Sequence, residues 1–194
     1  MFVLGIDPGL SRCGYGLVKK EVGSGGTLAL RGAPAVAVSG GVIVTDCSLD
    51  VPRRLSQLMR ELQALIAESR PDVVVVERIF FQANAKTAVS IGQAGGLALA
   101  LADAAGCRIA QYSANEVKLA VTGYGGATKL QVQRMVASLL GLSGLPSPPD
   151  VADALGLALC YLVNLPMQAA LSTAIRGSGF NGQAVTVEAG GGIA

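Results

Sequence analysis

Histidine is absent from this chain of 194 residues. The absence excludes zinc sites that depend on imidazole ligands, Ser-His-Asp and Cys-His catalysis, and histidine general bases. Any hydrolytic chemistry must therefore use carboxylates, lysine, a bound metal ion or water.

Charged residues are also scarce, at 14% of the sequence against roughly 25% in a typical soluble domain. Apolar residues reach 51%, and the net charge is only +2. This composition predicts a dense globular domain, for which we expect residues 1–170 to suffice. In so weakly charged a chain, a group of acidic residues indicates a functional site. A near-neutral total neither predicts nor excludes a nucleic-acid partner.

The four cysteines are widely separated and form no C-x-x-C pair. This spacing favours reduced thiols over disulfides or a zinc site. The apolar run at residues 2–6 is short and has no basic residues before it, which argues against a secretory signal. We therefore expect a cytoplasmic protein.

A long uncharged segment over residues 154–175 raises the alternative of a membrane span. Pro166 interrupts the segment, many alanines dilute its hydrophobicity, and two aspartates precede it. We therefore predict a buried helix that begins at Asp150 and ends near Pro166, with no membrane partner. The glycine-rich residues 177–194 have no apolar face, which predicts a disordered tail.

Apolar patterning predicts an α/β domain. Helical spacing or composition predicts helices over residues 51–69, 85–105, 115–121, 128–140 and 150–166. Short apolar runs predict strands over residues 2–6, 14–19, 35–45, 73–76 and 108–112, with a Gly/Ser-rich loop over residues 21–34. Three strands in a meander followed by alternating helices and strands indicate a five-stranded mixed sheet, with three antiparallel strands and then two parallel ones, flanked by helices.

Four carboxylates occupy positions where this topology could bring them together. Asp7 and Glu77 each follow a buried strand, and parallel neighbouring strands would place both at one sheet edge, where ligands bind in α/β folds. Asp150 and Asp153 are spaced i, i+3 at a helix start, so they share a face. Such a cluster needs a divalent cation to offset its repulsion, and Mg²⁺ prefers carboxylate oxygens. Each signal alone also fits an ordinary turn, a strand end or a helix-dipole interaction.

The same residues lie in segments that resemble the RuvC family of Holliday-junction resolvases. The resemblance covers about residues 1–165 in order. Its motifs are FVLGIDPGLSRCGYGL (2–17), VVVVERIFF (73–81), GQAGG (92–96), NEVKLAVTG (115–123), QVQRM (131–135) and DVADALGL (150–157).

The resemblance implies a ribonuclease-H-like fold and a nuclease that nicks four-way DNA junctions symmetrically. It also implies catalysis by Mg²⁺ or Mn²⁺, with two ions per site when DNA is bound, a homodimer, and the RuvA–RuvB branch-migration complex as partner. The family's catalytic, metal-binding carboxylates correspond to Asp7, Glu77, Asp150 and Asp153.

The resemblance also suggests residues that contact DNA. Phe80 matches the family aromatic that stacks near the junction centre, and Lys118 and Lys129 match basic positions. Further candidate contacts are Lys86, Arg78 and Arg134. The segment over residues 20–41 looks longer than usual for the family, and Gly95 stands where relatives often carry arginine.

Three other functions remain open from the sequence. An actin-like or sugar-kinase-type ATPase also has a first strand ending in Asp-x-Gly, but such proteins need two of these domains. Another ribonuclease-H-like nuclease would share the carboxylates. A catalytically inert junction-binding module would gain from losing them, so their retention argues against that function.

Overall fold

The computed structural model describes residues 1–20, 35–78 and 85–177, with side chains assigned through Leu165 except at residues 85–87. The predicted loop at 21–34, Phe80 and all of the predicted tail at 177–194 except Gly177 lie outside the described residues. The strands are β1 (Phe2–Asp7), β2 (Arg12–Lys20), β3 (Ala35–Val44), β4 (Val73–Glu77) and β5 (Arg108–Tyr112). The helices are α1 (Val51–Ser69), α2 (Ala85–Ala104), α3 (Ala114–Thr122), α4 (Lys129–Leu139) and α5 (Pro149–Gly177).

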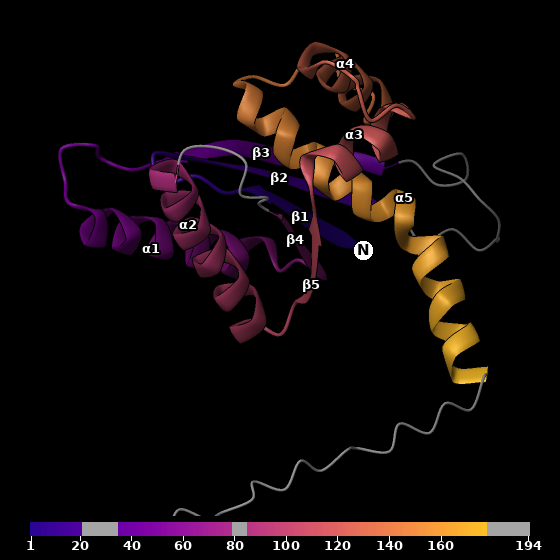
Figure 1. The fold of residues 1–194 in the computed structure, drawn as a ribbon, viewed down its shortest axis with the longest axis horizontal. Helices are drawn as coiled ribbons and strands as arrows, with labels where there is room; N and C mark the ends of the chain where they lie inside the picture. Colours follow the sequence, from indigo (N-terminus) through magenta and orange to yellow (C-terminus); the bar gives the residue numbers. More distant parts are fainter. Residues whose placement is uncertain (21–34, 79–84, 178–194) are drawn as a thin grey trace, which may run out of the picture.

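The strands form one sheet in the order β3-β2-β1-β4-β5 (Figure 1). β2 pairs antiparallel with both β1 and β3, whereas β4 pairs parallel with both β1 and β5. The predicted mixed sheet and the predicted parallel neighbours β1 and β4 are therefore confirmed. In this register Ile6 lies opposite Val76, so both strands end at the same edge.

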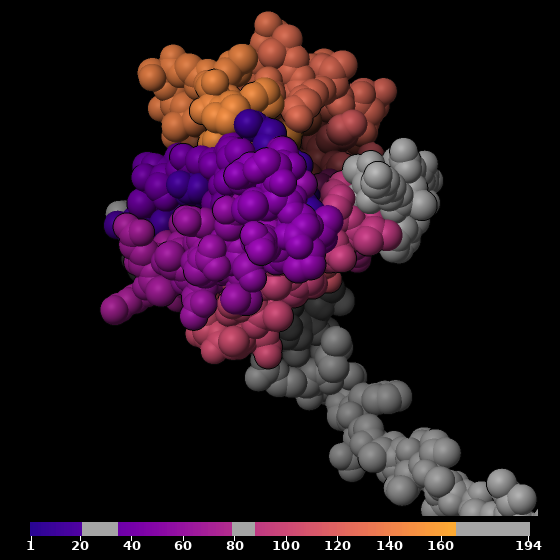
Figure 2. All heavy atoms as spheres, turned by 90° about the vertical axis from the view of Figure 1, so that its left-hand side faces the viewer, coloured from indigo at the N-terminus to yellow at the C-terminus, as the bar shows by residue number. Residues whose placement is uncertain are grey.

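Helices cover both faces of the sheet, as the alternation of buried valines in β4 requires. Val73 and Val75 face a cluster that includes α5, α3 and α4. Val74 and Val76 face the opposite cluster, which includes α1 and α2. Figure 2, viewed towards α1, shows α4 and the start of α5 standing above the layer built by the N-terminal half of the chain.

α5 packs unusually close to the two central antiparallel strands because glycines face it. A Cβ atom at Gly5 would overlap the carbonyl group of Ala154, and one at Gly14 would collide with the backbone of Asp150. Gly16 faces Leu155 in the same way. These glycines therefore fix how near the first turns of α5 lie to the end of β1.

The end predicted for this helix near Pro166 is wrong, since α5 continues to Gly177. Proline removes one N–H donor and crowds the preceding turn, at a cost of about 3 kcal/mol, but it need not end a helix. The residues that follow Pro166 include strong helix formers such as Met167 and Ala169. Figure 1 shows the last turns of α5 projecting beyond the sheet.

The first half of α5 is a buried helix, as the sequence predicts. Leu155, Leu157, Leu159 and Leu162 are each at most 2% exposed, because the helix lies against the sheet. Within the ranges that the structure describes, no helix has both the length and the apolarity to cross a bilayer.

Because α5 lies so close to β1, adding a single methyl group between them should strongly lower the stability of the fold. Gly5→Ala should lower the free energy of unfolding by about 3 kcal/mol or more, because the new Cβ overlaps backbone that cannot move aside. Gly144→Ala is the control, since a Cβ there meets no atom within 4 Å, and should change stability by less than about 0.5 kcal/mol. Urea denaturation measures both. Equal stability of the two variants would contradict the packing described.

Candidate active site

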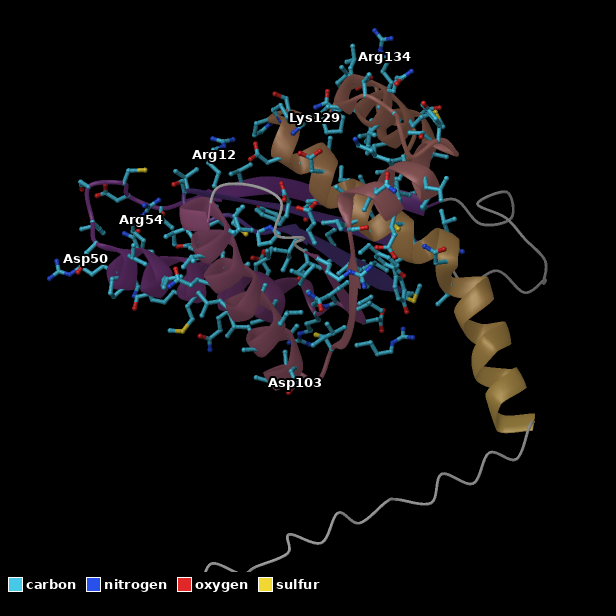
Figure 3. The ribbon with its side chains drawn as sticks, in the orientation of Figure 1. Arg12, Asp50, Arg54, Asp103, Lys129 and Arg134 are labelled. Carbon is cyan, nitrogen blue, oxygen red and sulfur yellow. The ribbon has the colours of Figure 1, made fainter. Side chains whose placement is uncertain are left out.

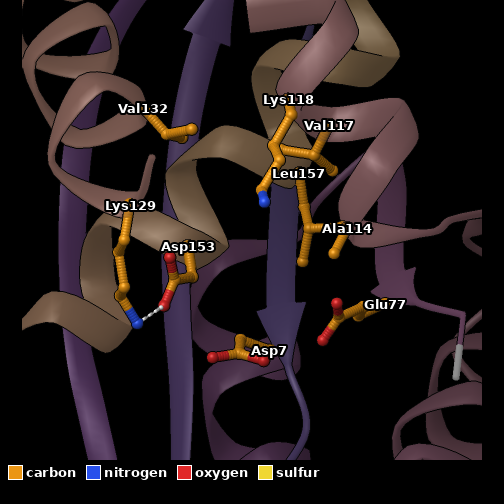
Figure 4. Close-up of a pocket in the computed structure, with 9 residues that line it drawn as sticks. All are labelled: Asp7, Glu77, Ala114, Val117, Lys118, Lys129, Val132, Asp153 and Leu157. Carbon is orange, nitrogen blue, oxygen red and sulfur yellow. Dashed lines mark hydrogen bonds and ion pairs between the residues drawn. The ribbon is translucent and has the colours of Figure 1, made fainter. Parts of the chain in front are cut away.

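A pocket of about 280 Å³ opens at the shared edge of β1 and β4 (Figure 4). Acidic, basic and apolar side chains from separate parts of the chain line it together. The lining residues are Asp7, Glu77, Ala114, Val117, Lys118, Lys129, Val132, Asp153 and Leu157.

Parallel pairing of β1 and β4 brings Asp7 and Glu77 into this pocket. Asp7 is the last residue of β1, and Glu77 is the last residue of β4. Both strands are buried up to that point, so each carboxylate emerges where the sheet first meets solvent. The predicted convergence of these two residues is confirmed.

The first turn of α5 supplies the other two carboxylates, with different orientations. Asp153 lines the pocket, and Figure 4 shows its carboxylate near that of Asp7. Asp150 does not line the pocket. It accepts hydrogen bonds from Arg12, at 2.9 Å from Nη2 to Oδ2 and 3.4 Å from Nε to Oδ1. All four carboxylates nevertheless interact electrostatically, since Glu77, Asp153 and Asp150 each raise the pKa of Asp7.

Burial and mutual repulsion both disfavour the charged form of Asp7. Its pKa rises from 3.8 to about 7, first because burial disfavours the charged form and then because Glu77 and the other carboxylates repel it. Burial likewise raises the pKa of Glu77. The pair therefore holds a proton near neutral pH unless a cation compensates the charge.

Two basic side chains offset part of this charge. Lys129 donates a hydrogen bond of 2.7 Å from Nζ to Asp153, which raises the pKa of Lys129. The hydrogen bond from Arg12 lowers the pKa of Asp150. Figure 4 also shows the ammonium group of Lys118 directed into the pocket.

Capping boxes at the starts of α3 and α4 fix the positions of Lys118 and Lys129. Ser113 and Glu116 form a capping box at the start of α3, and Thr128 and Gln131 form another at the start of α4. Each box satisfies backbone N–H groups and so fixes where its helix begins. Lys129 consequently lies in the first turn of α4.

The other predicted DNA contacts lie outside the pocket or outside the described side chains. Arg78 forms an ion pair of 2.6 Å with Glu116. Arg134 is exposed on α4, and Figure 3 shows it at the outer tip of that helix. Lys86 begins α2 but its side chain is not described, and Phe80 lies outside the described residues. Their roles stay predictions.

Arg12 is a site residue that sequence reasoning missed. It begins β2, five positions after Asp7, and contacts a carboxylate 138 residues further along the chain. An arginine close behind the Asp-Pro-Gly turn was the available signal. Only the tertiary fold reveals its partner.

The donor set fits a hard divalent cation. It consists of carboxylate oxygens without sulfur or imidazole, which Mg²⁺ and Mn²⁺ prefer. Burial and the neighbouring carboxylates raise the pKa of Asp7, and a cation bound beside it would offset both effects. Among the described residues, no three acidic or cysteine side chains are already arranged as a metal-binding group, and Asp150 and Asp153 are directed to their basic partners.

The shifted pKa of Asp7 predicts a pH dependence of stability in chelator. Between about pH 4 and pH 7 the folded chain binds more protons at Asp7 than the unfolded chain, so the free energy of unfolding falls as pH rises. Asp7→Asn should remove this component, on the order of 2 kcal/mol. Urea denaturation of both proteins at pH 5 and pH 8 measures the difference. The same pH dependence in both would contradict the assigned pKa.

Comparisons with known proteins agree on one family. The family described as "Crossover junction endodeoxyribonuclease RuvC" matches residues 3–161. A crossover junction endodeoxyribonuclease RuvC of Syntrophomonas wolfei is 48% identical over 84% of this chain and 88% of its own length.

Solved structures give the same result. The RuvC structure of Thermus thermophilus is 33% identical and superposes with a TM-score of 0.76 over 87% of this chain and 97% of that one. The T. thermophilus RuvC in complex with a Holliday junction substrate gives 30% identity and a TM-score of 0.73, covering 86% and 96% of the two chains. The expected ribonuclease-H-like resolvase fold is therefore confirmed, and the chain belongs to the RuvC family of crossover junction endodeoxyribonucleases.

Proposed function

We propose that this chain resolves four-way DNA junctions by metal-dependent hydrolysis of phosphodiester bonds. The observation that carries the proposal is the pocket in which Asp7, Glu77 and Asp153 meet Lys118 and Lys129. Carboxylates hold cations and lysines bind phosphate, so the pocket has the groups that a metal-dependent nuclease needs. Family membership and the junction-bound T. thermophilus relative support a four-way junction as substrate.

Asp7, Glu77, Asp150 and Asp153 would hold the metal ions, which are Mg²⁺ or Mn²⁺ in this proposal, two per site with DNA bound. Such ions supply an activated water and stabilise the leaving oxygen. The raised pKa of Asp7 supports this role, because a cation would offset the burial and the repulsion that raise it.

The basic residues position the DNA. Lys118 points into the pocket, and Lys129 lies beside Asp153, so both can reach a phosphate held there. Arg78, Arg134 and Lys86 would contact the DNA backbone further from the pocket. They would contribute a salt-dependent part of the affinity for DNA. Phe80 would stack on a base at the junction centre.

A homodimer would place two such pockets on the two strands that symmetric resolution must cut. The exposed side of α2 supports this part of the proposal, because Val89 is 58% exposed there, and Gly92 and Gly96 on the same helix leave room for a close neighbour. The RuvA–RuvB complex is the proposed partner in cells.

The carboxylates are tested by isosteric substitutions. Asp7→Asn and Glu77→Gln should each lower cleavage of a synthetic four-way junction in Mg²⁺ by at least about 100-fold, because each removes charge needed to hold the cation. Junction binding in chelator should remain. Asp103→Asn, an equal charge change far from the pocket at the end of α2 (Figure 3), should cleave normally. Cleavage at the parental rate by either pocket variant would refute the assignment.

The stacking role of Phe80 is tested against its neighbour. Phe80→Ala should lower junction cleavage by about tenfold or more, because it removes the free energy of stacking on one base. Its affinity for linear duplex should change little. Phe81→Ala is the matched control, and rates and affinities are measured on the same preparations. Equal losses for both substrates in Phe80→Ala would indicate a folding defect instead.

A further inference from the structure

Arg54 is fixed against the turn that follows β1. Its Nε donates to Thr45 Oγ1 at 3.0 Å, and its Nη2 donates to Ser11 Oγ at 2.6 Å and to Cys47 Sγ at 3.7 Å. Thr45 is only 2% exposed, and its own hydroxyl donates to the carbonyl of Leu10 at 2.6 Å. A buried anchor thus orients the Arg54 guanidinium in advance of any ligand.

The charge of Arg54 has no ion-pair partner within the described ranges. The basic residues that do form ion pairs there are Arg12, Arg53, Arg78 and Lys129. Asp46 feels the charge of Arg54, which contributes to lowering its pKa after the hydrogen bonds from Ser48, but it forms no ion pair with Arg54 and accepts instead from the Ser48 hydroxyl and N–H at 2.7 and 2.8 Å. All the acceptors of Arg54 in the described chain are neutral, so its positive charge remains available to an anion.

These contacts do not use all the N–H donors of Arg54. A guanidinium carries five N–H groups in a planar fork that matches a phosphate, and the contacts to Thr45, Ser11 and Cys47 leave Nη1 without an acceptor among the described residues. Ser11 is exposed and its oxygen accepts from Arg54, so its own hydroxyl proton can be donated outward.

Arg54 and Ser11 lie next to the pocket. Ser11 lies four residues after Asp7, and its neighbour Arg12 reaches Asp150. Figure 3 shows Arg12 and Arg54 on the same side of the molecule, at the end where β1 stops, with Lys129 beyond Arg12. A DNA strand that leaves the pocket over the turn after β1 would meet these groups in order.

We propose that Arg54 and Ser11, flanked by Arg12, form a subsite that binds a phosphodiester group of the DNA backbone next to the strand held in the pocket. The inference rests on the proposed function and adds a contact beyond the residues that line the pocket. Arg54 binds the phosphate through its free donors and keeps its hydrogen bonds to Thr45 and Ser11. The subsite recognises no base, so it positions the strand without sequence preference.

The test compares two adjacent arginines. In an Asp7→Asn background, which prevents cleavage, binding of a synthetic four-way junction is measured in chelator over a range of salt concentrations. Arg54→Gln should weaken binding about tenfold at low salt and reduce the slope of log K against log salt by about 1. Arg53→Gln removes the same charge from a side chain that is 75% exposed and paired with Asp50, and should change neither.

Thermal melting of each variant checks that it is folded. Should Arg54→Gln not fold, Arg54→Lys decides the matter, because it keeps the charge but loses the planar fork. Arg54→Lys should then bind the junction several-fold more weakly at an unchanged salt slope. Parental affinity of a folded Arg54→Gln or Arg54→Lys overturns the subsite and assigns Arg54 only to holding the turn. Failure of the Asp7→Asn protein itself to bind the junction would instead overturn the proposed function.

Discussion

Repulsion among carboxylates at one sheet edge is the constraint on which the site depends. Two parallel strands end side by side in Asp7 and Glu77, and α5 adds Asp153 to the same pocket. Buried negative charges cannot gather in this way without a proton or a cation to compensate them. Burial and this repulsion together raise the pKa of Asp7 to about 7, so the pocket favours the binding of positive charge.

The rest of the fold brings this charge together and partly balances it. Gly5, Gly14 and Gly16 let α5 approach the sheet closely enough to deliver its first-turn aspartates. Lys129 then forms an ion pair with Asp153, and Arg12 forms one with Asp150. Both basic residues can also bind phosphate. When metal ions compensate the carboxylates in their place, Lys129 and Arg12 are therefore suited to contact a DNA strand.

Much of the fold could be predicted because the central strands are short apolar runs that are buried on both faces of the sheet. Apolar runs before Asp7 and Glu77 indicated buried neighbouring strands, and two neighbouring parallel strands must end at one edge. The partners of the polar side chains could not be predicted in this way. Arg12 and Asp150 are 138 residues apart, and nothing local selects one partner from many. The end of α5 was mispredicted because Pro166 is a local signal that its helix-forming neighbours override.

Binding of a divalent cation to the full chain tests the central claim most directly. Thermal melting at pH 8 during titration with Mg²⁺ should show a rising melting temperature, because an ion that binds only the folded pocket stabilises it. The rise should be much smaller in Asp7→Asn, which lacks a ligand and part of the repulsion. A melting temperature that does not respond to Mg²⁺, or an equal rise in both proteins, would contradict a shared cation site at these carboxylates.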